Sequence, residues 1–326
     1  MQINDVYQAA ERIRGRVIRT PVLTLPELDT ELGAQIFLKA ELHQITGAFK
    51  IRGALNKILT LPPDAIRKGV VAASSGNHGR AVATLARTLA VPAVLVLPAD
   101  APAVKIEAIR REGARVVLYD PVRDDRDALT AAIAAEEGMQ ILPSSDDPAV
   151  AAGHGTLVLE LLAATGPLDR LVVPVGGGGL AAGCAIVAKT LYPAIEVIGV
   201  EPRDGDDTAR SLRAGHRVSV PTPDTLADGL RHRTPGRFTF EVNRRLLDAV
   251  VTVDDDEIAA GMGELWRHGR LVVEPSGACA LAAVRARRPD PAGLRVGVVL
   301  SGGNVDEEHF HRIIAPHVDR SYAPAR

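Results

Sequence analysis

The sequence has few cysteines and no excess of charge of either sign, and each shortage excludes a class of protein. Two cysteines among 326 residues, Cys184 and Cys279, are too few for a disulfide scaffold or a cysteine-rich metal site. A net charge of −2 provides no overall basic field, so we expect no nucleic-acid partner. The contents of 46% hydrophobic and 24% charged residues are those of an ordinary globular protein.

Targeting and membrane-spanning signals are also lacking. The first residues, Met1–Asp5, contain no basic region followed by an apolar one, so we expect no secretory signal. The most apolar stretch, Leu171–Ala188, is interrupted by Pro174 and a run of glycines, whereas a membrane helix needs ~20 apolar residues. We therefore expect a cytoplasmic protein without a membrane partner.

Short apolar segments alternate with helical segments rich in alanine, leucine and arginine, which is typical of a parallel α/β fold. Two of the predicted helices are Asn77–Ala90 and Asp255–His268, the second with Asp254 as N-cap and Gly269 as C-cap. The predicted strands are Ile36–Lys39, Val70–Ala73, Ala93–Leu97, Arg115–Leu118, Gln140–Leu142, Leu171–Val175, Glu196–Val200, Ala249–Val253 and Arg295–Leu300.

The length of 326 residues suits two domains, at ~150 residues per domain. Proline-containing breaks lie at Leu61–Asp64 and Pro143–Pro148. They bracket a block of strand–helix units. We predict a smaller α/β domain at 69–146, inserted into a larger domain made of 1–68 and 147–326.

A run of four glycines, Gly176, Gly177, Gly178 and Gly179, followed by Leu180, links an apolar strand to a predicted helix. Backbone N–H groups at a helix N-terminus bind anions, and glycines let a phosphate group approach closely. A tight turn alone needs one glycine. The run therefore predicts a phosphate-binding site.

The same run leaves a second interpretation open. Gly176, Gly178 and Ala181 satisfy the pattern G-x-G-x-x-A, and the next predicted strand is followed by Glu201. In a dinucleotide-binding fold, an acidic residue at this place binds the ribose. A nicotinamide-dependent dehydrogenase is therefore an alternative.

Lysine is scarce in this chain, and Lys50 stands out among the six lysines. It opens a predicted helix within Thr46–Ala54, among small and apolar residues. Desolvation lowers the pKa of an amine and makes it a nucleophile for Schiff-base chemistry. The simpler interpretation is a helix lysine that extends to solvent.

Two further polar segments follow predicted strands. Ser74, Ser75, Gly76, Asn77 and His78 form the first segment, which leads into a helix. Hydroxyl groups and N–H groups at a helix N-terminus suit a carboxylate, although Ser75 or Asn77 could simply cap the helix.

The second segment begins at Ser301, which ends an apolar strand at the edge where α/β proteins bind ligands. The alternative is an ordinary turn with an N-cap serine.

Together these segments resemble the fold-type-II pyridoxal-phosphate enzymes, in particular the threonine dehydratase and serine racemase family. The resemblance rests on T-G-A-F-K-I-R-G-A at 46–54, S-S-G-N-H-G at 74–79, the glycine run and S-G-G-N at 301–304, and extends from Arg19 to Asn304. It implies a two-domain, open twisted parallel-sheet fold like that of the tryptophan synthase β subunit. Pyridoxal 5'-phosphate would lie between the domains.

The resemblance also implies roles for particular residues. Lys50 would carry the cofactor covalently, and Ser75 would stand on the opposite side of the substrate as a second catalytic residue. Phe49 would pack against the cofactor ring, Gly176 to Gly179 and Leu180 would hold its phosphate, Asn77 would contact its 3-oxygen and Ser301 its pyridine nitrogen. The substrate carboxylate would be bound by Ser74, Ser75, Gly76, Asn77 and His78.

A serine beside the pyridine nitrogen leaves that nitrogen neutral, so the ring is a weaker electron sink, which suits prompt β-elimination. We predict dehydration and deamination of L-threonine or L-serine to a 2-oxo acid and ammonia, with Lys50 as the general base. Serine racemase and a dehydratase of another β-hydroxy amino acid, such as 3-hydroxyaspartate, are the alternatives. The segment Ser144–Pro148 departs from the family pattern near the substrate pocket, so the preferred substrate stays open. We expect a homodimer.

One acidic segment resembles the divalent-cation site of the serine racemase branch. Glu201 and Asp207 would be carboxylate ligands and Gly205 would supply a carbonyl oxygen. Oxygen ligands of this kind suit magnesium, manganese or calcium. The alternative is an acidic loop that caps the following helix.

Overall fold

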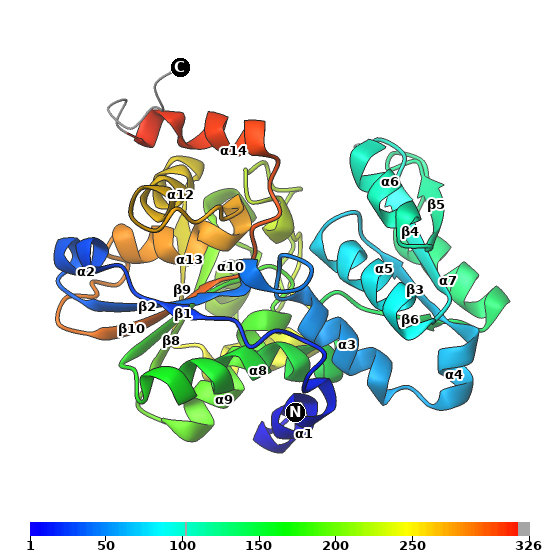
Figure 1. The fold of residues 1–326 in the computed structure, drawn as a ribbon, viewed down its shortest axis with the longest axis horizontal. Helices are drawn as coiled ribbons and strands as arrows, with labels where there is room; N and C mark the ends of the chain where they lie inside the picture. The colour runs from blue at the N-terminus through cyan, green and yellow to red at the C-terminus, as the bar shows by residue number, and fades with distance from the viewer. Residues whose placement is uncertain (102, 319–326) are drawn as a thin grey trace.

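The computed structural model describes residues 1–101 and 103–318, and Figure 1 shows two lobes side by side. The large lobe contains a six-stranded sheet and the small lobe a four-stranded sheet. Nearly all neighbouring strands are parallel, with helices packed on both faces of each sheet. The predicted α/β class with parallel sheets is confirmed.

The six-stranded sheet has the order β1-β2-β10-β7-β8-β9. Only β1 is antiparallel to its neighbour, with Val22 opposite Lys39. The strands are β1 (Val22–Leu23), β2 (Gln35–Ala40), β7 (Arg170–Pro174), β8 (Glu196–Pro202), β9 (Ala249–Val253) and β10 (Arg295–Leu300).

The four-stranded sheet has the order β5-β4-β3-β6 and is parallel throughout. Its strands are β3 (Val70–Ala73), β4 (Ala93–Pro98), β5 (Arg115–Tyr119) and β6 (Gln140–Ile141). All four fall inside the segment predicted as the smaller domain, whose boundaries remain a prediction.

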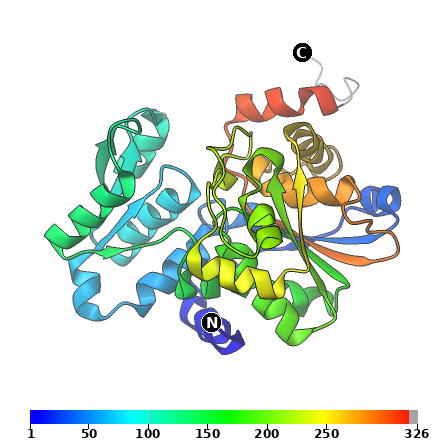
Figure 2. The ribbon, with the colours of Figure 1, turned by 180° about the vertical axis from the view of Figure 1, so that it is seen from behind.

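Helices cover both faces of each sheet, as Figures 1 and 2 show from opposite sides. One face of the large sheet packs against α2 (Pro26–Leu32), α12 (Asp255–Gly269), α13 (Pro275–Arg285) and α14 (Glu307–Ile314). The other face packs against α1 (Ile3–Ile13), α8 (Pro148–Thr165), α9 (Gly179–Leu191) and α11 (Arg237–Leu246). The small sheet has α5 (Asn77–Leu89) and α6 (Ala103–Arg111) on one face and α7 (Arg126–Glu137) on the other.

Shorter elements complete the described chain. They are α4 (Pro63–Lys68), α10 (Asp207–Ala214), η1 (Glu41–His43), η2 (Arg203–Gly205), η3 (Asp228–Leu230) and η4 (Ala315–His317).

Helix α3 (Lys50–Thr60) connects the two lobes. Its residues Ile51 and Leu55 belong to the core of the small lobe. On another side, the fully buried Arg52 forms ion pairs with Glu41 at 2.8 Å and with Glu160 of α8 at 2.7 Å. Because α3 is anchored in both lobes, the position of Lys50 at its N-terminus is fixed by the packing of the whole molecule.

Helix α8 is the one described helix that is long and apolar enough to cross a membrane. In this fold, 61% of that helix is buried, as is common for the core helix of a globular protein. Length and composition are therefore weak evidence for a membrane span here.

Candidate active site

The predicted motifs meet at the carboxyl ends of the parallel strands, where α/β folds bind their ligands. The N–H of Phe49 donates to the carbonyl oxygen of Ser301 at 3.0 Å, which places the start of α3 against the end of β10. The amide of Asn304 donates to Oδ1 of Asn77 at 2.7 Å, which brings the start of α5 to the same place. Segments more than 200 residues apart in the sequence therefore form one site.

Lys50 lies at the centre of this region. Its Nζ atom donates to the carbonyl oxygen of Ser144 at 2.8 Å and lies 5.1 Å from the centre of the Phe49 ring. Burial lowers the pKa of Lys50 to about 8, and the nearby carboxylate of Glu274 opposes that shift. An amine with such a pKa is partly neutral near physiological pH, as a nucleophile or general base must be.

The glycine run forms the turn between β7 and α9, as predicted. Gly178 is the N-cap of α9 and has a φ of +85°, a conformation that favours glycine. A Cβ atom there would lie 2.7 Å from Nδ2 of Asn243, so the close approach also requires glycine. Thr239 and Asn243 of α11 donate to the carbonyl oxygens of Gly177 and Gly178, at 2.8 and 3.2 Å.

This turn fits the phosphate of pyridoxal phosphate. Two of its carbonyl oxygens accept hydrogen bonds from side chains of α11, which fix the turn. The turn leads into the N-terminus of a 13-residue helix, where anions are stabilised. Leu180 is buried in the first turn of that helix. Neither Thr239 nor Asn243 was predicted from the sequence.

The segment after β3 also lies at this edge. The hydroxyl of Ser74 accepts the N–H of Gly76 at 3.2 Å, while the half-buried side chain of Ser75 has no hydrogen bond to any described residue. His78 is buried, and its Nε2 bonds to the carbonyl oxygen of Leu142 at 2.9 Å. Burial and the charge of Lys50 lower the pKa of His78 to about 4, so its ring is neutral.

Ser301 and Phe49 lie on either side of the contact between the end of β10 and the start of α3. Ser301 is 3% exposed at the end of β10. The Phe49 ring packs edge-on against the ring of His154 at 4.6 Å, and both nitrogens of His154 are buried without a partner among the described residues. His154 and Glu274 are neighbours of Lys50 that sequence reasoning missed, because they come from α8 and from the loop before α13.

A second group of acids lies at the end of β8. Glu201 is fully buried and accepts the N–H groups of Thr208 and Ala209, each at 2.9 Å. Asp207 is also fully buried, and neither of its carboxylate oxygens has a partner among the described residues. Burial and the charge of Asp207 raise the pKa of Glu201 to about 8, and burial raises the pKa of Asp207 to about 7.

These two acids and Gly205, buried against Pro202 and Pro223, fit a divalent cation. A buried carboxylate without a partner is costly, and a cation bound to its oxygens would remove that cost. Each oxygen of Glu201 accepts one N–H group at the start of α10 and keeps a second lone pair for a cation.

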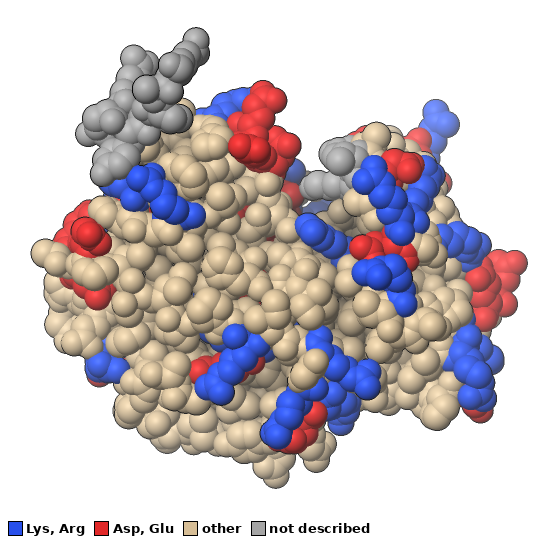
Figure 3. All heavy atoms as spheres, in the orientation of Figure 1, with Lys and Arg blue, Asp and Glu red and all other residues tan. Residues whose placement is uncertain are grey.

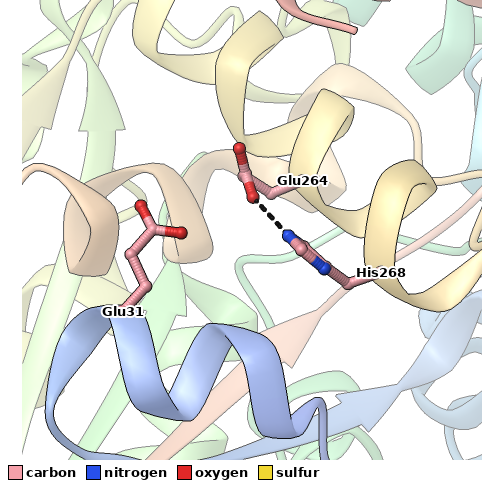
Figure 4. A group of neighbouring side chains, drawn as sticks. All are labelled: Glu31, Glu264 and His268. Atoms are coloured by element: carbon pink, nitrogen blue, oxygen red, sulfur yellow. Dashed lines mark hydrogen bonds and ion pairs between the residues drawn. The ribbon is translucent and has the colours of Figure 1, made fainter. Parts of the chain in front are cut away.

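Another acidic group is less suited to a cation. Glu31 of α2 and Glu264 and His268 of α12 have potential ligand atoms within 4.8 Å of one another. Figure 4 shows these three side chains. However, Glu264 already pairs with His268, Arg267 and Arg285, at 3.0, 2.7 and 3.4 Å. Its negative charge is therefore balanced by side chains.

Comparison with known proteins agrees with this geometry. The model of the family described as "Pyridoxal-phosphate dependent enzyme" matches residues 13–302. The L-threo-3-hydroxyaspartate ammonia-lyase of Pseudomonas sp is 44% identical over 95% of this chain and 98% of that protein. The L-threonine ammonia-lyase of Geobacter sulfurreducens is 41% identical over 92% of this chain and 75% of that protein. The structure of maize serine racemase has a TM-score of 0.91 at 36% identity, over 97% of each chain.

Proposed function

The chain belongs to the pyridoxal-phosphate dependent enzyme family, and from this premise we propose that it is an ammonia-lyase that converts a β-hydroxy amino acid to a 2-oxo acid and ammonia. The observation that carries the proposal is the placement of Lys50. Its amine, with a pKa lowered to about 8, lies where the turn at Ser74–Asn77 and the end of β10 meet. The nicotinamide alternative has no comparable use for this lysine.

The residues that would hold the cofactor are those of the predicted site. Lys50 would bind it covalently, the turn at Gly176–Gly179 and Leu180 would bind its phosphate, and Asn77, Ser301 and Phe49 would contact its ring. When bound, pyridoxal phosphate supplies an electron sink joined to the α-carbon of the substrate. The protein then has to orient the substrate and move protons.

The N-terminus of α5 suits the first of these tasks. Backbone N–H groups and the hydroxyl of Ser75 would bind the substrate carboxylate. Lys50, once free of the cofactor and neutral, would remove the α-proton, and the β-hydroxyl group would take up a proton and leave as water. His78 was predicted to contact the substrate carboxylate. Its Nε2 atom already bonds to the carbonyl oxygen of Leu142, so this atom would not bind the substrate.

L-Threonine and L-serine are the first candidate substrates, and L-threo-3-hydroxyaspartate is the second. His232, in the loop after η3, lies beside the glycine turn: a Cβ atom on Gly176 would be 2.9 Å from its ring. Burial, Lys50 and Arg126 lower the pKa of His232 to about 4. The His232 ring is therefore neutral and can offer a substrate a hydrogen bond but no charge. The second candidate rests on the similarity to the L-threo-3-hydroxyaspartate ammonia-lyase of Pseudomonas sp.

A racemase activity is the remaining alternative for the same site. It would require a second proton donor on the side of the substrate opposite Lys50, and Ser75 is the residue we propose for it. A serine hydroxyl is a weak acid and base, so we propose that elimination is faster than racemisation.

We also propose a divalent cation at Glu201, Gly205 and Asp207. The support is that the two buried oxygens of Asp207 have no partner among the described residues, although a second buried carboxylate lies beside them. The cation would stabilise the end of β8 and the start of α10. Magnesium, manganese and calcium all prefer such oxygen ligands.

A cytoplasmic location and a homodimeric assembly are further parts of the proposal, and the family resemblance supports the assembly. Light scattering coupled to size-exclusion chromatography tests the assembly. A mass of about one chain, near 34.4 kDa, would exclude the dimer.

The test of the function is a panel of β-hydroxy amino acids, with release of 2-oxo acid and ammonia measured on protein saturated with pyridoxal phosphate. We expect equal amounts of both products from at least one of L-threonine, L-serine and L-threo-3-hydroxyaspartate. Lys50→Ala protein is the control and should release neither product. Absence of 2-oxo acid from every substrate of the panel would contradict the proposal.

A further inference from the structure

Three hydrogen-bonded side chains join the two lobes at the candidate active site: Asn77, Glu274 and Asn304. Asn77 begins α5 of the small lobe, whereas Glu274 precedes α13 and Asn304 follows β10 in the large lobe. Nδ2 of Asn77 donates to Oε1 of Glu274 at 2.6 Å. Nδ2 of Asn304 donates to Oδ1 of Asn77 at 2.7 Å, and the backbone N–H of Asn304 donates to Oε2 of Glu274 at 3.1 Å. The three residues thus form a closed ring of hydrogen bonds.

This ring fixes which way the Asn77 amide faces. A carboxamide has one acceptor oxygen and two N–H donors. The oxygen of Asn77 accepts from Asn304, and one N–H donates to Glu274. A reversed amide would place an N–H group against the N–H of Asn304 and an oxygen against the carboxylate. One orientation is therefore selected, and it leaves one N–H of Asn77 for a ligand.

The side-chain amide of Asn304 is itself oriented by further hydrogen bonds outside the ring. Nδ2 of Asn304 also donates to the carbonyl oxygen of Thr46 at 2.8 Å, and its Oδ1 accepts from Arg80 at 2.7 Å. Thr46 belongs to the segment that leads to Lys50. The orientation of the Asn77 amide is thus set by residues before α3, on α5 and after β10.

Glu274 is held tightly in this place. It is 5% exposed, and its backbone N–H donates to the carbonyl oxygen of Gly302 at 3.1 Å. A Cβ atom at position 302 would lie 2.5 Å from Oε1 of Glu274, so glycine next to Ser301 makes room for the carboxylate. The carboxylate also lies close enough to Lys50 to stabilise its charged form. Glu274 is therefore placed between Asn77, Lys50 and the end of β10.

We propose that Glu274 is a positioning residue, which orients the Asn77 amide so that its remaining N–H donates to the 3-oxygen of bound pyridoxal phosphate. Such a donor stabilises the ionised form of that oxygen. The inference rests on the cofactor site of the proposed function and extends it to a residue that never has to touch the cofactor. It also means that this donor is oriented only when the two lobes are in contact.

The test is the visible absorbance of the cofactor-saturated protein, measured across pH for wild type, Glu274→Ala and Glu274→Gln. In Glu274→Ala the Asn77 amide is released, so we expect the long-wavelength band of the ionised 3-oxygen to weaken. The pH midpoint of that band should rise by about 0.5–1 unit, the effect of one hydrogen bond. Glu274→Gln keeps one acceptor oxygen for Asn77 and loses the acceptor for the N–H of Asn304, so its midpoint should lie between those of wild type and Glu274→Ala.

Two further variants make the result specific. Glu264→Gln removes an equally buried carboxylate, 5% exposed, on α12 and should leave the spectrum unchanged. Asn304→Ala releases the other end of the Asn77 amide, so it should shift the midpoint in the same direction as Glu274→Ala, even if the latter variant fails to fold.

An unchanged spectrum in Glu274→Ala or in Asn304→Ala would overturn the proposal. Equal losses in Glu274→Gln and Glu274→Ala would also overturn it, because they would assign the effect to charge rather than to orientation. A wild-type protein that shows a cofactor band but releases no 2-oxo acid would contradict the proposed reaction and leave this test intact.

Discussion

The pKa of Lys50 is the property of a single residue that most directly links this structure to chemistry. Burial lowers that pKa to about 8, and the carboxylate of Glu274 limits the decrease. A lysine extended to solvent would keep a pKa near 10.5 and would be charged at neutral pH. The environment at the start of α3 therefore gives this lysine a neutral fraction that a surface lysine lacks.

A pH profile tests this property. Because Lys50 has to be neutral to accept the α-proton, the rate at saturating substrate, where Lys50 is free of the cofactor, should rise with pH through a midpoint near 8. Glu274→Gln removes a charge that raises the pKa of Lys50, so it should move the midpoint to lower pH. A midpoint near 10 in the wild type, or no movement in Glu274→Gln, would contradict the assignment of Lys50 as the base.

Ser75 decides between lyase and racemase character. Ser75→Ala should abolish solvent-deuterium exchange and 2-oxo acid release with D-serine. Release from L-threonine or L-serine should fall by only about 3- to 10-fold, the effect of one lost hydrogen bond to the carboxylate. Ser74→Ala removes a neighbouring hydroxyl that already bonds to Gly76, so it should affect D-serine and L-serine alike. Wild-type rates with D-serine in Ser75→Ala would show that Ser75 has no role on the opposite side.

At the scale of helices and strands, the sequence patterns predicted most of the fold. All nine predicted strands are present, because buried parallel strands carry continuous apolar runs. Strand β1 was missed, since two residues, Val22 and Leu23, cannot display a period. The N-cap Asp254 is confirmed, but Gly269 is not the C-cap. It is the last residue of α12, and the C-cap is Arg270, which has a φ of +51°.

The site was only partly predictable, because local sequence patterns show local structure and not which distant elements pack together. Lys50, Asn77 and the glycine turn lie in local motifs whose residue types carry their own signal. Glu274, His154 and Asn243 reach the site only because of how distant elements pack, and nothing in their local sequence indicates it. Glu274 precedes the buried, apolar helix α13, and a carboxylate in that place is the one sign that could have suggested a function.

The end of β8 and the start of α10 form the predicted cation site, and its two acids predict a pH dependence. Their pKa values of about 8 and 7 lie above the ordinary 4.5 and 3.8. In cation-free protein, the folded state favours the protonated form of both acids. Their contribution to the free energy of unfolding is therefore complete at pH values below the ordinary pKa values, and is lost as pH rises to about 8. Chelated protein should therefore melt at lower temperature at pH 8 than at pH 6.

A bound cation should reverse that trend. Saturating magnesium should raise Tm by about 5 °C, and by more at pH 8 than at pH 6, because fewer protons compete for the carboxylates. Asp207→Asn should lose the response, while Asp204→Asn, an exposed neighbour, should keep it. A response unchanged in Asp207→Asn would mean that the cation binds elsewhere.

At the scale of the whole molecule, the site exists because two lobes meet. Figure 3 shows a surface notched between the lobes, with charges of both signs scattered over this face. Helix α3 crosses from one lobe to the other, and Lys57 pairs with Asp147 at 2.6 Å near its far end. Together with the ring of Asn77, Glu274 and Asn304, these contacts align Lys50 of α3 with the N-termini of α5 and α9.

The central claim is that Lys50, placed between the lobes, carries pyridoxal phosphate during the reaction. Borohydride reduction of the cofactor-saturated protein, followed by peptide mapping, tests it most directly, because reduction fixes the cofactor to the lysine that holds it. We expect the label on Lys50 alone, and we expect Lys50→Ala to bind the cofactor without covalent label and without turnover. Label on Lys39, Lys57 or another lysine, or turnover by Lys50→Ala, would contradict the account.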